Sequence, residues 1–367
     1  MQIDFANLKI QHNLYKEEIE EAILKVARDC NFIMGSQIDE LERNLEKFTG
    51  SKYAISCSSG TDALLLAMMA LDIQPDDEII TTPFTFFATA ETIALLKAKP
   101  VFVDIDEKTY NIDPKKIEEK ISSKTKAIIP VSLYGQPADM DEINQIAKKY
   151  NLKVIVDGAQ SFGSTYKGIS DSNLGDISCT SFFPAKPLGC YGDGGALFTN
   201  DEKLADKIKS LRLHGQSIRY HHQYIGMGGR LDTIQAAVLN VKLKYYEKDL
   251  KLRQDVAEKY TKALNAKNIE TPFVKSDRTS AWAQYSIRVE NRTELQTKLQ
   301  NLGIPTAVHY PMPLHVQECF KYLNLKEGDF PISEKVSKEI MSLPMNPYVS
   351  DEEIEFIVEN LAKELRC

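Results

Sequence analysis

The sequence is poor in cysteine and has no long hydrophobic run. Its six cysteines are scattered, form no CxxC pair and have no histidine at metal-ligand spacing: Cys30, Cys57, Cys179, Cys190, Cys319 and Cys367. A disulfide framework and a zinc site are therefore not expected. No apolar stretch approaches the length that spans a bilayer. The first residues also lack the pattern of a signal peptide, so we expect a soluble, cytoplasmic protein.

Clusters of positive charge are missing as well. The chain carries 45 Lys and Arg against 52 Asp and Glu, a formal net charge of -7, and no basic block stands out. A nucleic-acid-binding surface is therefore not expected. With 367 residues, 43% of them hydrophobic, the chain is long enough for a large core, and its length favours two domains.

Short strands rich in Val and Ile alternate with helices of about ten residues in the first two thirds of the chain. This alternation predicts an α/β fold with a largely parallel central sheet and helices on both faces. The expected strands are residues 53–57, 78–82, 100–104, 125–133 and 153–157. Ligands of such sheets bind beyond the carboxyl ends of the strands.

The character of the chain changes after a long charged helix predicted over residues 246–266. Short strands (285–289 and 305–308) then alternate with helices (293–302 and 350–365), and Ser350 with Glu353 forms a capping box for the last helix. We therefore predict a large domain over residues 1–245 and a smaller C-terminal α+β domain over residues 246–367.

One lysine, Lys186, lies in an irregular segment between two strand-like runs (SFFPAKPLGCYGDGGALF). Pro187 excludes a helix there, and four glycines follow within nine residues. Partial burial in such a segment favours the neutral amine, which can form a Schiff base with a carbonyl or with pyridoxal phosphate. The alternative is a plain loop lysine beside a glycine turn, and the segment alone does not separate the two.

Several residues at expected strand ends suit the other parts of pyridoxal phosphate, which are its phosphate, ring nitrogen, ring hydroxyl and ring faces. The turn with Gly60 and Thr61 begins a helix, and with Ser181 it suits a phosphate. Asp157 suits the pyridine nitrogen, Gln160 the ring hydroxyl and Phe86 a ring face. Each has a simpler interpretation alone: Thr61 as a helix cap, Asp157 as a turn acid, Phe86 as a core residue. A polar loop with His214 and two further histidines lacks carboxylates at ligand spacing, so no metal is predicted.

Five motifs together resemble the DegT/DnrJ/StrS family of sugar-nucleotide aminotransferases: SSGTDAL, FTFFATAET, VDGAQSFG, SFFPAKPLGCYGDGGA and GRLDTIQAAVL. The resemblance implies the aspartate-aminotransferase fold (fold type I) and a homodimer with shared active sites. It also implies that pyridoxal 5'-phosphate is held by Lys186 and cycles through pyridoxamine phosphate. It assigns Asp157, Gln160, Phe86, Gly60, Thr61 and Ser181 to the cofactor roles given above.

Within the family, the lysine segment, the HGQ and RYHH loop and AVHYPMPL resemble one branch most. That branch transfers the amino group of L-glutamate to carbon 3 of UDP-2-acetamido-2-deoxy-3-keto-glucuronate for O-antigen (lipopolysaccharide) synthesis. The resemblance makes His214, His309, Tyr310 and Arg230 candidate substrate contacts, with Arg230 supplied by the partner subunit. Gly228 departs from the family pattern, because an asparagine that reaches the partner's cofactor phosphate is usual there.

Other activities stay open on the sequence. A dTDP- or UDP-linked 3-keto or 4-keto deoxysugar is an alternative acceptor. A dehydratase of the same fold usually has histidine in place of Lys186. A non-catalytic sugar-nucleotide-binding regulator would be expected to lose at least one of the lysine, the acid and the phosphate cradle.

Overall fold

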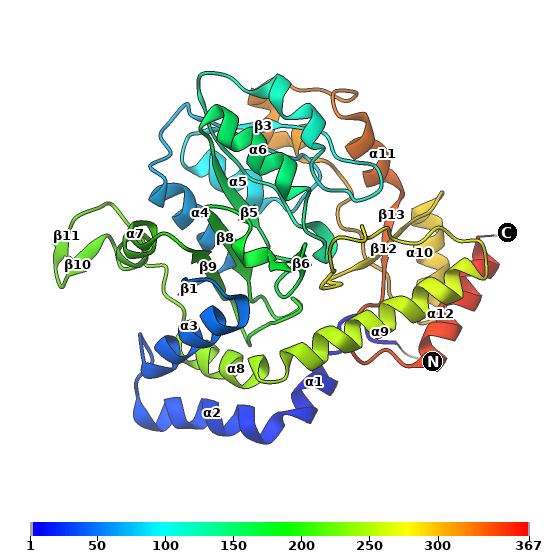
Figure 1. Cartoon of the computed structure of the whole chain (residues 1–367). Coiled ribbons are helices and arrows are strands. Elements are labelled where there is room, and N and C mark those ends of the chain that lie inside the picture. Colours follow the sequence, from blue (N-terminus) through cyan, green and yellow to red (C-terminus); the bar gives the residue numbers. More distant parts are fainter. Residues whose placement is uncertain (1–2, 366–367) are drawn as a thin grey trace.

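A seven-stranded sheet forms the centre of the computed structural model, which describes residues 3–365 (Figure 1). Its strand order is β1 (Tyr53–Cys57), β9 (Gly195–Thr199), β8 (Ile177–Ser181), β5 (Lys153–Asp157), β4 (Thr125–Ile128), β2 (Glu78–Thr81) and β3 (Lys99–Phe102). Only β9 runs antiparallel to its neighbours, β1 and β8. The predicted α/β class with a largely parallel sheet is confirmed.

Helices cover both faces of this sheet because its strands alternate their apolar residues between the faces. Ile79 and Ile155 belong to the core under α4 (Gly60–Ala70), α5 (Ala88–Leu95) and α7 (Glu202–Arg212). Their neighbours Ile80 and Val154 belong to the core under α6 (Met140–Tyr150). The helix α3 (Ser36–Thr49) packs on the same side, against β1.

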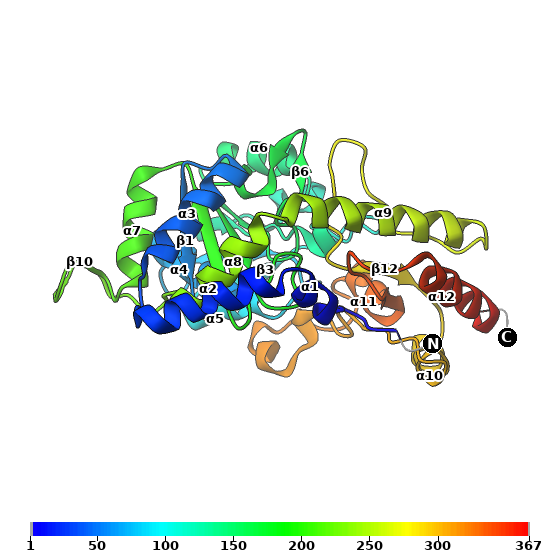
Figure 2. The same ribbon diagram turned by 90° about the horizontal axis from the view of Figure 1, so that it is seen from below.

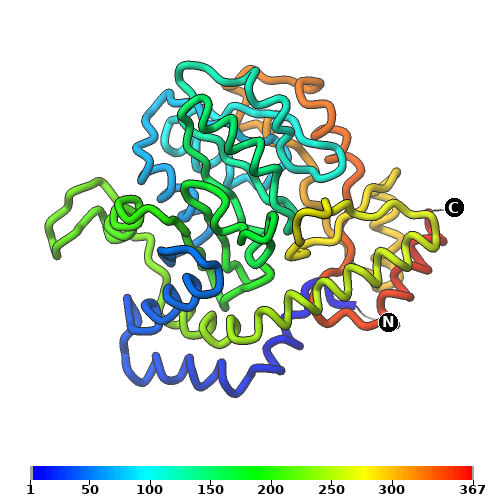
Figure 3. Tube along the Cα trace, viewed as in Figure 1, coloured from blue at the N-terminus to red at the C-terminus, as the bar shows by residue number. Residues whose placement is uncertain are grey.

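A second core lies at the far end of α9 (Tyr246–Asn265), the longest helix, which starts beside the sheet (Figure 2). It gathers α9, β12 (Tyr285–Arg288), β13 (Ile340–Leu343), α10 (Arg292–Asn301) and α12 (Asp351–Glu364). Ile3 joins this core, and the Cα trace shows the N-terminal segment beside the red C-terminal helix (Figure 3). The predicted boundary at residue 246 stays a prediction.

The remaining helices and the hairpin lie at the edges of the molecule. The helices α1 (Leu8–Leu14) and α2 (Lys16–Asp29) precede α3, and α2 packs on α8 (Thr233–Leu243). The strands β10 (Gln216–Ile218) and β11 (His221–His222) form a hairpin that projects from the body (Figures 1 and 2). A short β6 (Thr165–Tyr166) and β7 (Ile169–Ser170) pair locally, and α11 (Pro331–Glu339) precedes β13.

Two sequence predictions about the second core have different outcomes. The capping box at Ser350 is present: its Oγ accepts from the Glu353 N–H and the Glu353 carboxylate accepts from the Ser350 N–H. The strand predicted over residues 305–308 is wrong, because only Ala307 pairs with Ser342. The chain leaves the sheet there and carries His309 and Tyr310 toward the strand ends of the large sheet.

The described part of the chain contains five of the six cysteines. Cys30, Cys57, Cys179, Cys190 and Cys319 are free thiols, while Cys367 lies outside the described residues. Between residues 3 and 365 no helix is both long and apolar enough to cross a membrane.

Candidate active site

A cavity of about 490 Å³ opens at the carboxyl ends of the sheet strands. This is the size and position expected for a ligand site in an open α/β sheet. Nine of the predicted site residues line it: Gly60, Thr61, Phe86, Asp157, Gln160, Ser181, Lys186, His309 and Tyr310. Two predicted substrate contacts, His214 and Arg230, do not.

Lys186 reaches the cavity from a turn, as the proline and glycines predict. The turn is closed by backbone bonds from the Lys186 N–H to the Phe183 carbonyl (2.8 Å) and from Cys190 to Phe182 (2.8 Å). The buried Lys242 ammonium donates to the Gly189 carbonyl at 2.5 Å and so holds the part of the turn that follows Lys186. Burial lowers the pKa of Lys186, and the charge of Asp157 opposes this only in part. The amine is therefore available as a nucleophile and base more often than that of a surface lysine.

Asp157 is the last residue of β5 and is 5% exposed. Its Oδ2 accepts from the Thr89 hydroxyl at 2.7 Å, and its Oδ1 accepts from the Ala159 N–H at 3.2 Å. Burial raises the pKa of Asp157, while these two hydrogen bonds and Lys186 lower it. A cation against this carboxylate would favour its ionised form further. A protonated ring nitrogen is such a cation.

The first turn of α4 supplies an anion cradle. The Ser59 hydroxyl caps the helix by accepting from the Asp62 N–H at 3.0 Å, so the prediction of Thr61 as the cap is wrong. The N–H groups of the first helical residues have no partner within a helix and favour negative charge. A Cβ on Gly60 would lie 2.7 Å from the Ser181 Cβ, so only glycine lets the two segments approach this closely.

His309 and Tyr310, which follow the bridge between Ala307 and β13, form another part of the cavity wall. The Gln160 Oε1 accepts from the Tyr134 N–H at 2.7 Å, which turns its amide nitrogen toward the Tyr310 hydroxyl at 3.0 Å. The half-exposed Phe86 ring lies 6.0 Å from the Tyr310 ring. The Nδ1 of His309 is 2.9 Å from the Ser342 hydroxyl, and burial lowers the pKa of His309 to about 4.

His214 and Arg230 flank the β10–β11 hairpin in the sequence, and neither lines the cavity. Across residues 3–365 the Arg230 side chain has no hydrogen bond or ion pair. The His214 imidazole covers Gly228, because a Cβ there would be 3.1 Å from its Cε1. An asparagine at position 228 would require this ring to move. The substrate roles of both residues stay predictions.

The cavity also contains residues that the sequence did not single out: Ser59, Thr85, Phe183, Asp193 and Gln284. Ser59 directly precedes Gly60, the first residue of α4, so the sequence could have identified Ser59 as the N-cap of this helix. Gln284 comes from the segment before β12, and its Oε1 is buried without a partner among the described residues. Gln284 could not be identified as a cavity residue from the sequence, because it reaches the cavity only through the packing of the second core on the sheet.

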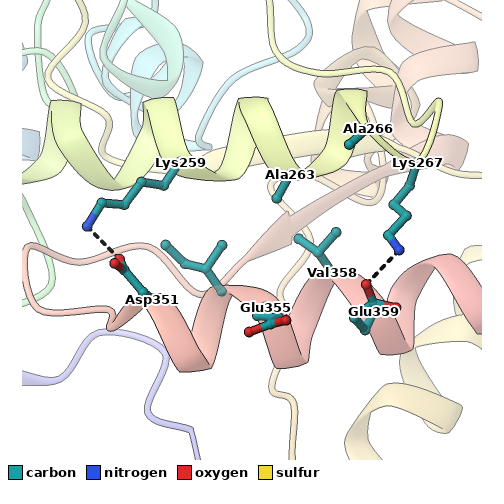
Figure 4. Close-up of a pocket in the computed structure, with 9 residues that line it drawn as sticks. Lys259, Ala263, Ala266, Lys267, Asp351, Glu355, Val358 and Glu359 are labelled. Atoms are coloured by element: carbon teal, nitrogen blue, oxygen red, sulfur yellow. Dashed lines mark hydrogen bonds and ion pairs between the residues drawn. The ribbon is translucent and has the colours of Figure 1, made fainter.

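A second cavity, of about 380 Å³, lies between α9 and α12 (Figure 4). Its floor is apolar, with Ala263 and Val358, and the ion pairs Lys259–Asp351 (2.5 Å) and Lys267–Glu359 (2.6 Å) link the two helices across it. Both lysines are paired and lie at the surface. In the first cavity a half-buried lysine and a buried carboxylate lie together at a helix N-terminus, whereas the lysines of the second cavity are paired at the surface.

This fold and this site define an enzyme of the aminotransferase class. The chain belongs to the DegT/DnrJ/EryC1/StrS aminotransferase family, whose pattern matches residues 13–362. The predictions of the family and of the aminotransferase fold are thereby confirmed.

Several curated and solved relatives of the chain are named as aminotransferases, while one of 44% identity from Geobacillus stearothermophilus is named a pleiotropic regulatory protein. The chain is 51% identical to the UDP-2-acetamido-2-deoxy-3-oxo-D-glucuronate aminotransferase of Pseudomonas aeruginosa, over 97% of this chain and 98% of that protein. A DegT DnrJ EryC1 StrS aminotransferase from Brucella abortus is 39% identical with a TM-score of 0.96, covering 99% of this chain and 100% of that one. NtdA of Bacillus subtilis, solved with bound cofactor PMP, is 31% identical with a TM-score of 0.92, covering 100% and 86%.

Proposed function

We propose that this aminotransferase moves the amino group of L-glutamate to carbon 3 of UDP-2-acetamido-2-deoxy-3-keto-glucuronate. The observation that carries the proposal is the cavity in which Lys186 and Asp157 meet the N-terminus of α4. The 51% identity to the Pseudomonas aeruginosa enzyme supports this acceptor. A cytoplasmic location and a role in O-antigen synthesis belong to the same proposal.

The cofactor is pyridoxal 5'-phosphate, and the residues of the cavity fit it. Lys186 would hold its aldehyde carbon, and Asp157 would pair with its ring nitrogen. The close approach of Gly60 to Ser181 shapes a cradle for its phosphate at the helix N-terminus. When bound, the cofactor withdraws the electron pair that is left on a substrate carbon when its proton departs.

In this proposal Lys186 carries the proton in both halves of the reaction. Its lowered pKa leaves a neutral amine that removes the proton from the α-carbon of glutamate. In the second half the same group, after taking up a proton as the ammonium, would deliver that proton to carbon 3 of the sugar and return to the neutral amine. Gln160, anchored by Tyr134, presents an amide N–H on the cavity side, where it would orient the cofactor ring.

The carboxylate of the proposed acceptor calls for a positively charged side chain, which we expect from the partner subunit. His309 is uncharged at neutral pH, because its pKa is about 4, so it offers a hydrogen bond but no positive charge. A guanidinium binds a carboxylate with two parallel hydrogen bonds. We therefore assign this role to Arg230 of a second copy in a homodimer. The exposed Ile225 (93%) and Ile218 (72%) near the hairpin support an interface there.

Visible absorbance tests cofactor, lysine and amino donor together. Purified protein should show the yellow absorbance of the lysine-bound cofactor, and glutamate should bleach it. Lys186→Ala cannot form this bond, so it should lack the lysine-bound absorbance and show no conversion of added cofactor to its amine form at saturating glutamate. Lys149→Ala, a change at a surface lysine, should behave as the parent. A colourless protein that stays colourless with added pyridoxal phosphate would refute the proposal.

The acceptor is tested by recovery of the yellow band. A UDP-linked 3-keto-uronate should restore it, and the matching 3-keto sugar without the carboxylate should do so at least tenfold less efficiently, since the charged hydrogen bond is lost. Recovery with a dTDP- or UDP-linked 4-keto deoxysugar alone would favour the alternative acceptor. Binding of UDP-sugars without any half-reaction would favour the regulator.

A further inference from the structure

A short row of buried hydroxyl groups leads from the cavity wall to Asp157. Thr85 lines the cavity, and its Oγ1 is 3.0 Å from the Oγ1 of Thr89. The Thr89 hydroxyl in turn donates to Asp157 Oδ2 at 2.7 Å. Thr89 is fully buried and Thr85 is 2% exposed, so water does not compete for these bonds.

The hydrogens of this row run in one direction when Asp157 is ionised. A carboxylate only accepts hydrogen bonds, and a threonine hydroxyl has a single hydrogen to donate. Thr89 gives its hydrogen to Asp157, so Thr85 must be the donor at the Thr85–Thr89 contact. The row therefore directs two aligned dipoles at the carboxylate.

The orientation of Thr89 differs from the usual behaviour of a threonine in a helix. Such a hydroxyl often donates to the carbonyl four residues earlier, and Thr92 on the same helix does so, to Ala88 at 2.9 Å. The Thr89 hydroxyl is turned to Asp157 instead. Among residues 3–365 it is the only side chain that hydrogen-bonds this carboxylate, whose other bond comes from the Ala159 N–H.

We propose that Thr89 is a positioning residue for the reaction: it holds the Asp157 carboxylate ionised and aimed into the cavity, with Thr85 orienting the Thr89 hydroxyl. The functional consequence rests on the proposed function, in which Asp157 pairs with the cofactor ring. A hydrogen bond to the charged form of a carboxyl favours that form. Without the Thr89 donor, Asp157 holds its proton to higher pH and its carboxylate is free to rotate.

The other charged or titratable groups near Asp157 come from four different segments. Lys186 belongs to the lysine turn, Tyr310 to the segment after Ala307, Asp171 to the turn after β7, and Cys179 to β8. None of them is changed by a substitution at position 89. A shift in the titration of Asp157 in a Thr89 variant is therefore assigned to the lost hydroxyl.

The test compares Thr89→Val with Thr92→Val in the full chain. Both changes remove one buried threonine hydroxyl from α5 and keep the side-chain shape, but only Thr89 touches Asp157. With the cofactor removed, carbon-13 NMR of labelled aspartate carboxyls follows Asp157, assigned through Asp157→Asn. We expect its titration midpoint to rise by about one pH unit in Thr89→Val. Thr92→Val should leave it unchanged, and Thr89→Ser should restore it.

The cofactor-loaded proteins give the second readout. Thr89→Val should slow the glutamate half-reaction about tenfold to a hundredfold, Thr92→Val by less than about twofold, and Thr89→Ser should recover most of the rate. Equal titration midpoints in Thr89→Val and Thr92→Val would overturn the inference. If Thr89→Val does not fold, Thr85→Val should shift the midpoint the same way by a smaller amount, and an unshifted midpoint would overturn it.

Failure of the proposed function has a different signature. The parent protein would then show no half-reaction, while the carboxyl titration would still report whether Thr89 controls Asp157. A shifted midpoint in that case would support the positioning of Asp157 and would reject only the chemistry assigned to it.

Discussion

At the scale of single residues, the site depends on burial more than on residue type. Burial lowers the pKa of Lys186 and raises that of Asp157. In the proposed function burial therefore favours the neutral amine of Lys186, whereas the Asp157 carboxylate is kept ionised by its hydrogen bonds and by Lys186. The sequence revealed Lys186 through its neighbours, a proline and a cluster of glycines. It did not reveal Thr89, because the bond from Thr89 to Asp157 joins residues 68 positions apart, nor Gln284, which lines the cavity only in the folded chain.

His309 makes stability depend on pH in a predictable direction. Its pKa is about 4 in the folded protein and near 6.5 in an unfolded chain, so only the unfolded chain binds this proton in between. The stabilisation is complete above about pH 6.5 and is lost as the pH falls toward 4. In urea titrations, His309→Gln should remove about 1–2 kcal/mol of that pH dependence, since the ring is partly exposed.

The matched control for His309 is His221→Gln, because His221 is exposed on the hairpin. It should keep the full pH dependence of the free energy of unfolding. Equal slopes for the parent and His309→Gln between pH 6.5 and 4 would contradict the prediction.

At the scale of elements, the contact between β9 and the start of α4 sets the shape of the cradle. A Cβ on Gly195 would lie 2.4 Å from the Ser59 carbonyl oxygen, which is backbone and cannot turn away. Gly195→Ala should therefore separate the two elements, lower the free energy of unfolding by roughly 2–4 kcal/mol and weaken cofactor binding at least tenfold. Denaturant titration and cofactor titration measure the two effects.

Gly168→Ala is the control for that change. Gly168 has a positive φ of +80° but no atom within 4 Å of an added Cβ. Its cost is about 1 kcal/mol of backbone strain, and cofactor affinity should stay as in the parent. Loss of cofactor affinity in both variants would show that general destabilisation, rather than the cradle, is responsible.

The capping box of α12 provides a second test at this scale. Ser350→Ala removes the acceptor for the Glu353 N–H, so the free energy of unfolding should fall by about 1 kcal/mol. Ser350→Asp keeps an acceptor and should cost only a few tenths of that. A loss of less than about 0.3 kcal/mol in Ser350→Ala would show that water replaces the cap.

Elements with strong local patterns were predictable from the sequence, and elements made by tertiary packing were not. The strands β1 and β5 have the predicted bounds, because both are short runs of apolar residues with clear ends. The segment 305–308 has the residues of a strand but forms one bridge, since its path is set by the cavity wall. The helix α11, with a proline at its first turn, was not predicted.

At the scale of the whole molecule, the proposed homodimer makes a quantitative prediction about mixed subunits. If Arg230 serves the partner's cavity, Arg230→Ala and Lys186→Ala should be nearly inactive alone. A mixed dimer then has one site with both defects and one with neither. After subunit exchange at equal amounts, about a quarter of the parent activity should return. No recovery, although mass spectrometry shows mixed dimers, would place both residues in the same subunit's site.

The bond between Asn346 and the Phe5 carbonyl joins residues 341 positions apart, and Ile3 fills the same core. During synthesis on the ribosome, this core therefore cannot close until nearly the whole chain has emerged. The large sheet, by contrast, has all its strands by Thr199. Newly made chains pass through a stage in which a finished sheet carries an unfinished partner with exposed apolar surface, and that stage is where chaperones would be needed.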